Sequence, residues 1–138
     1  MKDIEKAKKQ FLNEKLTFVL VNADKKLVSA ERGIKPMYLG VTTNKGLSQG
    51  ASVADKVIGK AAALLAVYGG ITSVYTCLTT FSAIEVCKKH CIAIEYEKVV
   101  VSIKNRDKSD VCPMEKLSSG VTEPVEMLKR VSDFINKP

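Results

Sequence analysis

The stretch from Ala61 to Ile84 contains no charged residue, and it is the strongest constraint that the sequence places on the fold. Up to Tyr68 its residues are apolar or tyrosine, and a helix with no polar face is buried inside a domain. We predict a central helix from about Ser52 or Ala54 to Tyr68, ended by Gly69-Gly70 in a left-handed turn. The stretch is long enough to cross a bilayer, but its glycine pair and its later threonines and serines favour a helix followed by a strand. We therefore predict no membrane segment.

A strand–helix–strand unit follows the central helix. Residues 71–78 and 92–96 have strand character, and the segment between them starts with Ser82 and Glu85 at capping-box spacing and continues as a helix to about His90. A connection of a dozen or more residues through a helix is typical of two parallel strands. We predict a parallel pair here, and residues 99–103 fit either a short strand or an apolar helix.

The two ends of the chain complete an α/β domain. An amphipathic surface helix is expected over residues 1–14, and a C-terminal helix carries an apolar stripe over residues 125–135. Between them, strand patterns at 16–21 and 26–30 around a turn at 24–25 predict a hairpin. Pro36 predicts the start of a short helix, and the glycines of 44–50 predict a loop. The prediction is one domain, residues 1–138, with the surface helix 1–14 and a core over 15–136. Its mixed sheet has helices on both faces, a three-layer α-β-α arrangement.

Composition narrows the classes of protein to which the chain belongs. The chain has 138 residues, a formal net charge of +7 and 6% aromatic residues, without tryptophan. Basic residues are scattered and few aromatics lie among them, so a nucleic-acid interface is disfavoured. A secretory segment is not expected, because residues 1–16 are rich in lysine and glutamate. We expect a cytoplasmic protein whose four cysteines are reduced.

Two motif-like patterns do not meet the requirements of their sites. Gly59-Lys60 resembles the end of a phosphate-binding loop, but Ala54 and Ala61 occupy the positions of the other required glycine and of the serine or threonine. Cys87 and Cys91 lie one helical turn apart beside His90, without a second pair of ligands at zinc-finger spacing. We favour structural roles for these cysteines and predict no metal site.

Cys112-Pro113 has two interpretations. A helix that begins at Pro113 would place the Cys112 thiol near backbone amides that stabilise a thiolate, which makes Cys112 a candidate nucleophile. The alternative, which we favour, is a half-buried structural cysteine before a turn.

Asp55, Lys56 and Lys60 introduce charge at the start of an otherwise apolar helix. Charges at the end of a buried helix must reach water or meet partner charges. In sheets covered by helices, ligands gather where strand ends meet helix N-termini. A ligand pocket and an internal ion-pair network are equally compatible with this pattern.

Several of these residues together resemble a known family. The run from Ala54 to Leu64, Tyr68-Gly69-Gly70, Asn105-Arg106-Asp107 and Cys112-Pro113-Met114-Glu115 are similar to the family catalogued as domain of unknown function 1893, over roughly residues 16–135. The resemblance implies a cytidine deaminase-like fold. It implies no particular reaction.

The zinc chemistry of deaminases does not fit these residues. Zinc deaminases use His (or Cys)-x-Glu and Pro-Cys-x-x-Cys at two helix starts. Val53-Ala54-Asp55 and residues 111–115 would stand at these positions, so Val53 replaces a ligand and Glu115 replaces the second cysteine. The standard zinc mechanism is therefore disfavoured, although an unusual metal stays open.

Three functional hypotheses follow. The first is a binding domain for a small anionic or nucleotide-like ligand, with a site formed by Asp55, Lys56, Lys60, Asn105, Arg106, Cys112 and Glu115. The second is an enzyme that uses Cys112 as nucleophile or Asp55 as general base, with or without metal assistance. The third is a nucleic-acid-binding protein. The sequence specifies no cofactor, and a homo-oligomer is compatible with it.

Overall fold

The structure is a computed structural model that describes residues 1–43, 45–105 and 110–137. Its centre is a five-stranded mixed sheet with the order β2-β1-β3-β4-β5. The strands are β1 (Phe18–Asn22), β2 (Lys25–Ser29), β3 (Ser52–Ile58), β4 (Ser73–Thr80) and β5 (Ala93–Val100). Pairing is antiparallel between β1 and both β2 and β3, and parallel along β3, β4 and β5. The predicted hairpin and the predicted parallel crossover are both confirmed.

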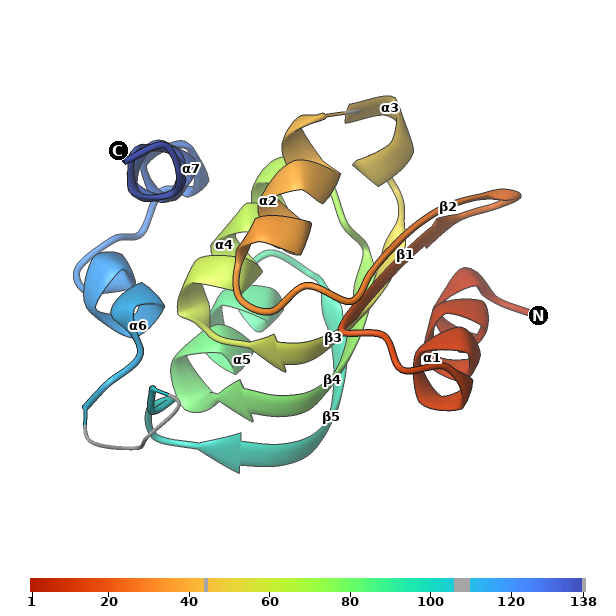
Figure 1. Ribbon diagram of the computed structural model, residues 1–138, viewed down its shortest axis with the longest axis horizontal. Helices are drawn as coiled ribbons and strands as arrows, with labels where there is room; N and C mark the ends of the chain where they lie inside the picture. The colour runs from red at the N-terminus through yellow and green to blue at the C-terminus, as the bar shows by residue number, and fades with distance from the viewer. Residues whose placement is uncertain (44, 106–109, 138) are drawn as a thin grey trace.

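Helices cover both faces of the sheet (Figure 1). One face carries α1 (Asp3–Asn13), and the other carries α2 (Lys35–Thr42), α4 (Lys60–Gly69) and α5 (Phe81–Lys89). The short α3 (Lys45–Ser48) follows α2, while α6 (Pro113–Ser118) and α7 (Pro124–Ile135) lie further from the sheet, beyond α4. The predicted helices at both ends and at Pro36 are confirmed, and α3 lies in the segment predicted as a loop.

Helix α4 is buried because it has neighbours on all sides. It packs against α2, α5, α6 and α7, and its residues from Ala61 to Ala66 are all buried. Gly70 follows in a left-handed conformation with φ of 78°, as the glycine pair predicts. At Gly69, a Cβ atom would lie 2.4 Å from Cγ1 of Val41 in α2, so only glycine allows this close approach. Within the described residues, no helix has the length and apolar character needed to span a bilayer.

The predicted start of the central helix is wrong. Residues 52–58 form strand β3, and the helix begins only at Lys60 after the extended Gly59. The β-branched residues Val53, Val57 and Ile58 suit a strand, which is held by β1 on one side and β4 on the other. Asp55 and Lys56 therefore lie on a strand, not in the first turn of a helix.

The start of α5 also differs from the prediction in one detail. The Thr80 hydroxyl, not the Ser82 hydroxyl, caps the helix by accepting a hydrogen bond of 3.1 Å from the backbone N–H of Ala83. The strand β4 ends at Thr80, so the cap directly joins the strand to the helix. Of the residues 99–103, predicted as a strand or a helix, Val99 and Val100 form the end of strand β5.

Two apolar clusters hold the layers together. The larger cluster lies between the sheet and α2, α4, α5 and α7, with Phe18, Leu20 and Val53 among its buried sheet residues. The smaller cluster lies under α1, where the Phe11 and Tyr75 rings meet edge to face with centroids 6.1 Å apart. Because alternate strand residues face opposite sides, Val53 and Asp55 point toward the larger cluster and Ala54 toward α1.

Candidate functional site

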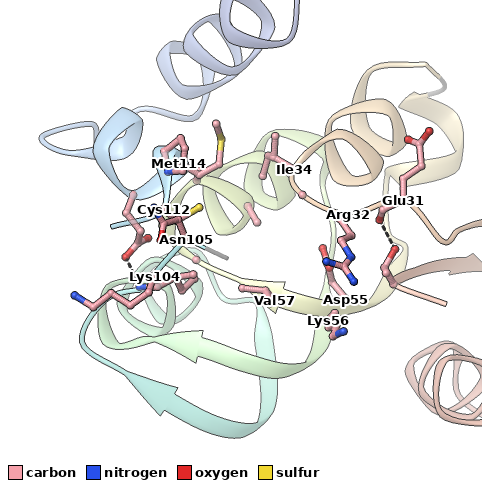
Figure 2. Close-up of a pocket in the computed structure, with 18 residues that line it drawn as sticks. Glu31, Arg32, Ile34, Asp55, Lys56, Val57, Lys104, Asn105, Cys112 and Met114 are labelled. Carbon is pink, nitrogen blue, oxygen red and sulfur yellow. Dashed lines mark hydrogen bonds between the residues drawn. The ribbon is translucent and has the colours of Figure 1, made fainter. Parts of the chain in front are cut away.

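A cavity of about 470 Å³ opens at the carboxyl end of β3. Figure 2 shows its walls, which come from segments far apart in the sequence. They are the turn 31–34 before α2, residues 55–57, 59 and 61–62 from β3 into α4, residues 103–105 after β5, and residues 112–115 at the start of α6, together with Thr17. In α/β sheets, the carboxyl ends of parallel strands are the usual place for ligands. The cavity is thus in the position where this class of fold binds small molecules.

Asp55 supplies a buried carboxyl to the cavity wall. Its strand position is fixed by Phe18 of β1 on one side and Thr76 of β4 on the other, and only 7% of its surface is exposed. Burial raises the pKa of Asp55 to about 8, although hydrogen bonds from the backbone N–H groups of Val57 and Lys56 partly oppose that rise. At neutral pH this side chain is therefore mostly protonated, so it can donate a hydrogen bond as well as accept one.

Glu115 ties the far wall of the cavity together. Its Oε2 accepts a hydrogen bond of 3.2 Å from the backbone N–H of Ile103, which links α6 to the segment after β5. A Cβ atom on Gly59 would lie 3.0 Å from Oε1 of Glu115 and 2.9 Å from Cδ1 of Ile103. The carboxylate therefore lies close to the start of α4, a helix without a side-chain cap, where negative charge is favourable.

Cys112 lies at the start of α6, the helix that the less favoured of its two interpretations requires. It is the N-cap residue and is partly buried, and its backbone N–H donates a 2.8 Å hydrogen bond to the Ile103 carbonyl. Its side chain makes no cap hydrogen bond, and the thiol lines the same cavity as Asp55. In Figure 2, Cys112, Asn105 and Met114 lie at one end of the cavity and Asp55 at the other, with Val57 between them.

Exposed basic side chains surround the opening. Arg32, Lys56 and Lys104 line the cavity, and each is exposed. Across the described part of the chain, none of the three forms an ion pair. Glu31 is an exposed carboxylate at the same opening. The rim therefore offers more uncompensated positive than negative charge.

Comparison with family models identifies the chain. The model of a domain of unknown function (DUF1893) matches residues 6–135, which include every segment of the cavity wall. The chain belongs to the DUF1893 family. The search of curated proteins finds no match.

A solved member of the DUF1893 family has a similar fold. The crystal structure of a DUF1893 family protein from Thermotoga maritima superposes with a TM-score of 0.86 at 22% sequence identity. The match covers 97% of this chain and 91% of the other. At this identity the similarity establishes the fold and leaves the chemistry of the site to the residues themselves.

The predicted site residues of this DUF1893 domain are only partly together. Asp55, Lys56, Asn105, Cys112 and Glu115 all line the cavity, with the first two at the end of β3 and the others on the opposite wall. Their role in binding stays a prediction. Arg106 lies outside the described residues.

Lys60 belongs to a different surface. It lines a smaller cavity of about 180 Å³ between α4 and α5, with Ser82, Glu85, Lys89 and His90 among its neighbours. The helix begins at Lys60 and not at Ser52 or Ala54, so Asp55 and Lys56 lie on strand β3 while Lys60 lies on α4. The three residues therefore do not share one helical face.

Cys87 and Cys91 lie in different environments. Cys87 is fully buried in the larger apolar cluster, and burial raises its pKa to about 11. Cys91 is exposed in the turn before β5, with a positive φ of 59°. A buried, protonated thiol and an exposed one are poorly suited to share a metal ion.

Sequence reasoning missed the turn 31–34 and the residues Ile103 and Lys104. The turn reaches the cavity because β1 pairs with β3, which sets Thr17 beside Lys56 through a backbone hydrogen bond of 3.0 Å. The Thr17 hydroxyl in turn donates to the Glu31 carbonyl. A hairpin can be read from sequence, but which strand it joins depends on contacts between distant residues.

Proposed function

We propose that this DUF1893 domain binds a small molecule of nucleotide-like chemistry in the cavity beside Asp55. The main support is the carboxyl of Asp55, which is 7% exposed, lines the cavity and has no ion-pair partner within the described residues. Burying a carboxyl is unfavourable unless hydrogen bonds compensate, and the chain itself supplies backbone N–H groups of Lys56 and Val57. A bound ligand would add further hydrogen-bond partners on the cavity side.

The chemistry of the walls narrows the ligand class. A protonated carboxyl presents one donor and one acceptor side by side, which complements the amide-like edge of a heterocyclic base. The apolar side chains of Ile34, Val57 and Met114 would cover a planar ring. Arg32, Lys56 and Lys104 at the opening would pair with an anionic group such as a phosphate. An anionic molecule with a heterocyclic body satisfies all of these groups.

The proposed setting is a cytidine deaminase-like fold without the standard zinc site. The hairpin, the mixed sheet and the strand–helix units support that assignment. Helices α2, α4 and α6 begin at this cavity with Ile34, Gly59 and Cys112 as their caps, and of these three only Cys112 is a zinc donor. Val53-Ala54-Asp55, the segment expected to replace the first zinc motif, lies on a strand. The described residues contain no cluster of three metal-binding side chains, so we derive no step through zinc.

Ligand screening by thermal shift tests this proposal. Nucleosides, nucleotides and related anions should include compounds that raise the melting temperature of the wild-type chain. Affinity for such a compound should fall about tenfold, roughly 1.4 kcal/mol, in Arg32→Ala or Lys56→Ala. Lys98→Ala, on the far strand β5, is the matched control and should bind normally. Unchanged affinity in Asp55→Asn, Arg32→Ala and Lys56→Ala alike would exclude this cavity as the binding site.

Catalysis is the second candidate, favoured by one observation. Cys112 and Asp55 line the same cavity, and a carboxyl whose pKa is about 8 is suited to exchange protons near neutral pH. A nucleophilic Cys112 should react with iodoacetamide faster than the exposed Cys91 does. Mass spectrometry of tryptic peptides measures both rates in one sample, and a slower reaction at Cys112 would contradict the nucleophilic role.

A further inference from the structure

Strand β2 presents an unpaired edge with exposed apolar side chains. It lies at one end of the sheet and pairs with β1 alone among the described strands. Leu27 and Val28 are 37% and 42% exposed. An edge of this kind is a template for pairing with another strand. The identity of that strand can be argued from the charges that flank the two apolar residues.

The backbone of β2 has its free hydrogen-bonding groups at alternate residues. The Ser29 carbonyl accepts a hydrogen bond from the backbone N–H of Thr17, the residue before β1, and the Glu31 carbonyl accepts one from the Thr17 hydroxyl. Because backbone groups alternate in direction along an antiparallel strand, those of Lys26, Val28 and Ala30 face away from β1. A second antiparallel strand would bond to these three residues.

A second copy of β2 fits this edge in one register. When a two-fold axis passes through Val28, residues whose numbers add to 56 lie opposite each other. Val28 then meets Val28 of the second copy, and Lys26 meets Ala30. Strand β2 runs from Lys25 to Ser29, so Asp24, Glu31 and Arg32 lie just outside it. If residues 24 and 30–32 continue the same pairing in the dimer, Lys25 lies opposite Glu31 and Asp24 lies opposite Arg32, and the symmetry repeats both pairs. All of these flanking charges are exposed, and none forms an ion pair within the described residues.

Neighbouring registers lack this match. An axis through Lys26 sets that lysine against itself, and an axis through Ser29 sets Lys26 against Arg32. An axis through Leu27 leaves Lys26 opposite Val28. Like charges that are directly opposite destabilise a strand pair, whereas opposite charges stabilise it. Of these registers, only the Val28 register sets Lys25 and Arg32 opposite carboxylates, while Lys26 lies opposite Ala30.

The other edge of the sheet does not show this complementarity. On β5, an axis through Tyr96 sets Glu95 against Glu97, and axes through Glu97 and Lys98 set each of these residues against itself. Glu95 and Glu97 are moreover engaged inside the chain, with Lys8 and the Tyr75 hydroxyl. The charge pattern therefore distinguishes β2 from β5 as a surface for self-association.

We propose that two copies of this chain form a symmetric dimer by antiparallel pairing of β2 with β2, with Val28 on the two-fold axis. The dimer contains one continuous sheet of both copies. Glu31 and Arg32 also line the cavity, so the interface adjoins the cavity opening, and Lys25 and Asp24 of the second copy lie beside it. The observations that carry the dimer do not include the cavity ligand, but Arg32 is common to both proposals and would contact Asp24 of the second copy as well as an anionic ligand.

Charge reversal and its rescue test the dimer on the full chain. Analytical ultracentrifugation of the wild type should show a species of twice the 15.1 kDa mass of one chain. Lys25→Glu or Glu31→Lys alone should weaken dimerisation at least tenfold, since each sets like charges opposite at two places, and the double variant should restore it. Lys98→Glu on β5 is the control with the same charge change and should dimerise like the wild type.

Two results would overturn the proposal. The first is a wild-type chain that stays monomeric up to its highest soluble concentration, in which case Lys25 and Lys26 serve to keep the edge from pairing. The second is a dimer that Lys98→Glu weakens as much as Lys25→Glu does, or that the double variant fails to restore. Circular dichroism of each variant separates loss of the dimer from loss of the fold.

A cross-link tests the register itself. Val28→Cys should form a disulfide between copies under mild oxidation, since residues opposite each other lie about 5.5 Å apart and within disulfide range. Lys26→Cys on the same face is the control, because its two copies would be offset by four residues, roughly 13 Å. Equal cross-linking of both variants, or of neither, would contradict the Val28 axis.

Discussion

A carboxyl that is buried among uncharged groups binds its proton more tightly in the folded protein than in the unfolded chain. For Asp55 this raises the pKa from 3.8 to about 8. Below pH 3.8 the side chain is protonated in both states, and its protonation favours neither state. As the pH rises from there toward 8, the unfolded chain loses the proton first, so the folded state becomes progressively less stable.

Asp55→Asn should remove this pH dependence. An amide keeps the shape of the side chain and an oxygen for the N–H groups of Lys56 and Val57, but it does not titrate. Chemical denaturation between pH 4 and 8 should show the wild type losing stability relative to the variant by up to about 1.4 kcal/mol per pH unit, a few kcal/mol in total. A difference that stays constant across this range would mean that Asp55 is ionised in the folded protein.

Single residues also show how far the sequence could predict the site. The sequence singles out Asp55 and Lys56 because they are charged residues next to an apolar segment. Both line the cavity, although they lie on a strand and not on the predicted helix. Arg32 and Lys104 carried no such signal, because exposed basic residues in loops are common. They reach the cavity through the pairing of β1 with β3 and through the path of the chain after β5, both of which are long-range contacts.

At the scale of elements, the sequence predicts the helices and strands whose periodicity or cap is contained in their own residues. The hairpin, the N-terminal helix, the C-terminal helix and the strand–helix–strand unit each have a periodicity or a cap that their own residues carry. Strand β3 was missed because Ala54, Asp55 and Lys56 are compatible with a helix, and the partners that make the segment a strand lie elsewhere in the chain. Tertiary pairing overrides such weak local preferences.

The packing of α4 against α2 gives a prediction at this scale. Gly69→Ala should destabilise the protein by about 2 kcal/mol or more, because the new Cβ would lie 2.4 Å from Cγ1 of Val41 and both helices would have to separate. The gain in helix propensity, up to about 1 kcal/mol, is smaller. Urea denaturation measures the change.

Gly40→Ala is the matched control on α2. Its Cβ would lie 3.3 Å from Cζ of Phe18, a contact that a small movement of the ring relieves. Its loss of stability should therefore be well below that of Gly69→Ala. Similar losses for both variants would show that the α2–α4 contact is more adaptable than its geometry suggests.

At the scale of the whole molecule, the three layers form one structure and not a core with an appendage. Ala7 and Phe11 of α1 are 0% and 6% exposed, and beneath α1 lie Val19, Val21, Ala54 and Tyr75 of the sheet. The sequence predicted a surface helix over 1–14 beside a core of 15–136. The structure makes that helix the outer layer on one face of the sheet (Figure 1).

A chain shortened to residues 15–138 should therefore lose its cooperative unfolding transition. Removal of α1 would expose the apolar face of the sheet, and such a surface promotes aggregation. Calorimetry and the fluorescence of a dye that binds apolar surfaces measure both effects. Lys6→Ala is the control, since it removes the exposed ion pair with Asp3 but keeps the apolar contact, and it should melt close to the wild type. A shortened chain that melts sharply would show that the other two layers fold alone.

The order in which the cavity walls occur along the chain has a consequence for protein synthesis. The turn 31–34 and the segment 55–62 leave the ribosome early, whereas residues 103–115 leave it after all five strands. Until α6 arrives, Asp55 borders an open groove that lacks the wall held by Glu115. The site is thus completed only after the sheet, and a nascent chain can offer it to a ligand only when its sheet has already been made.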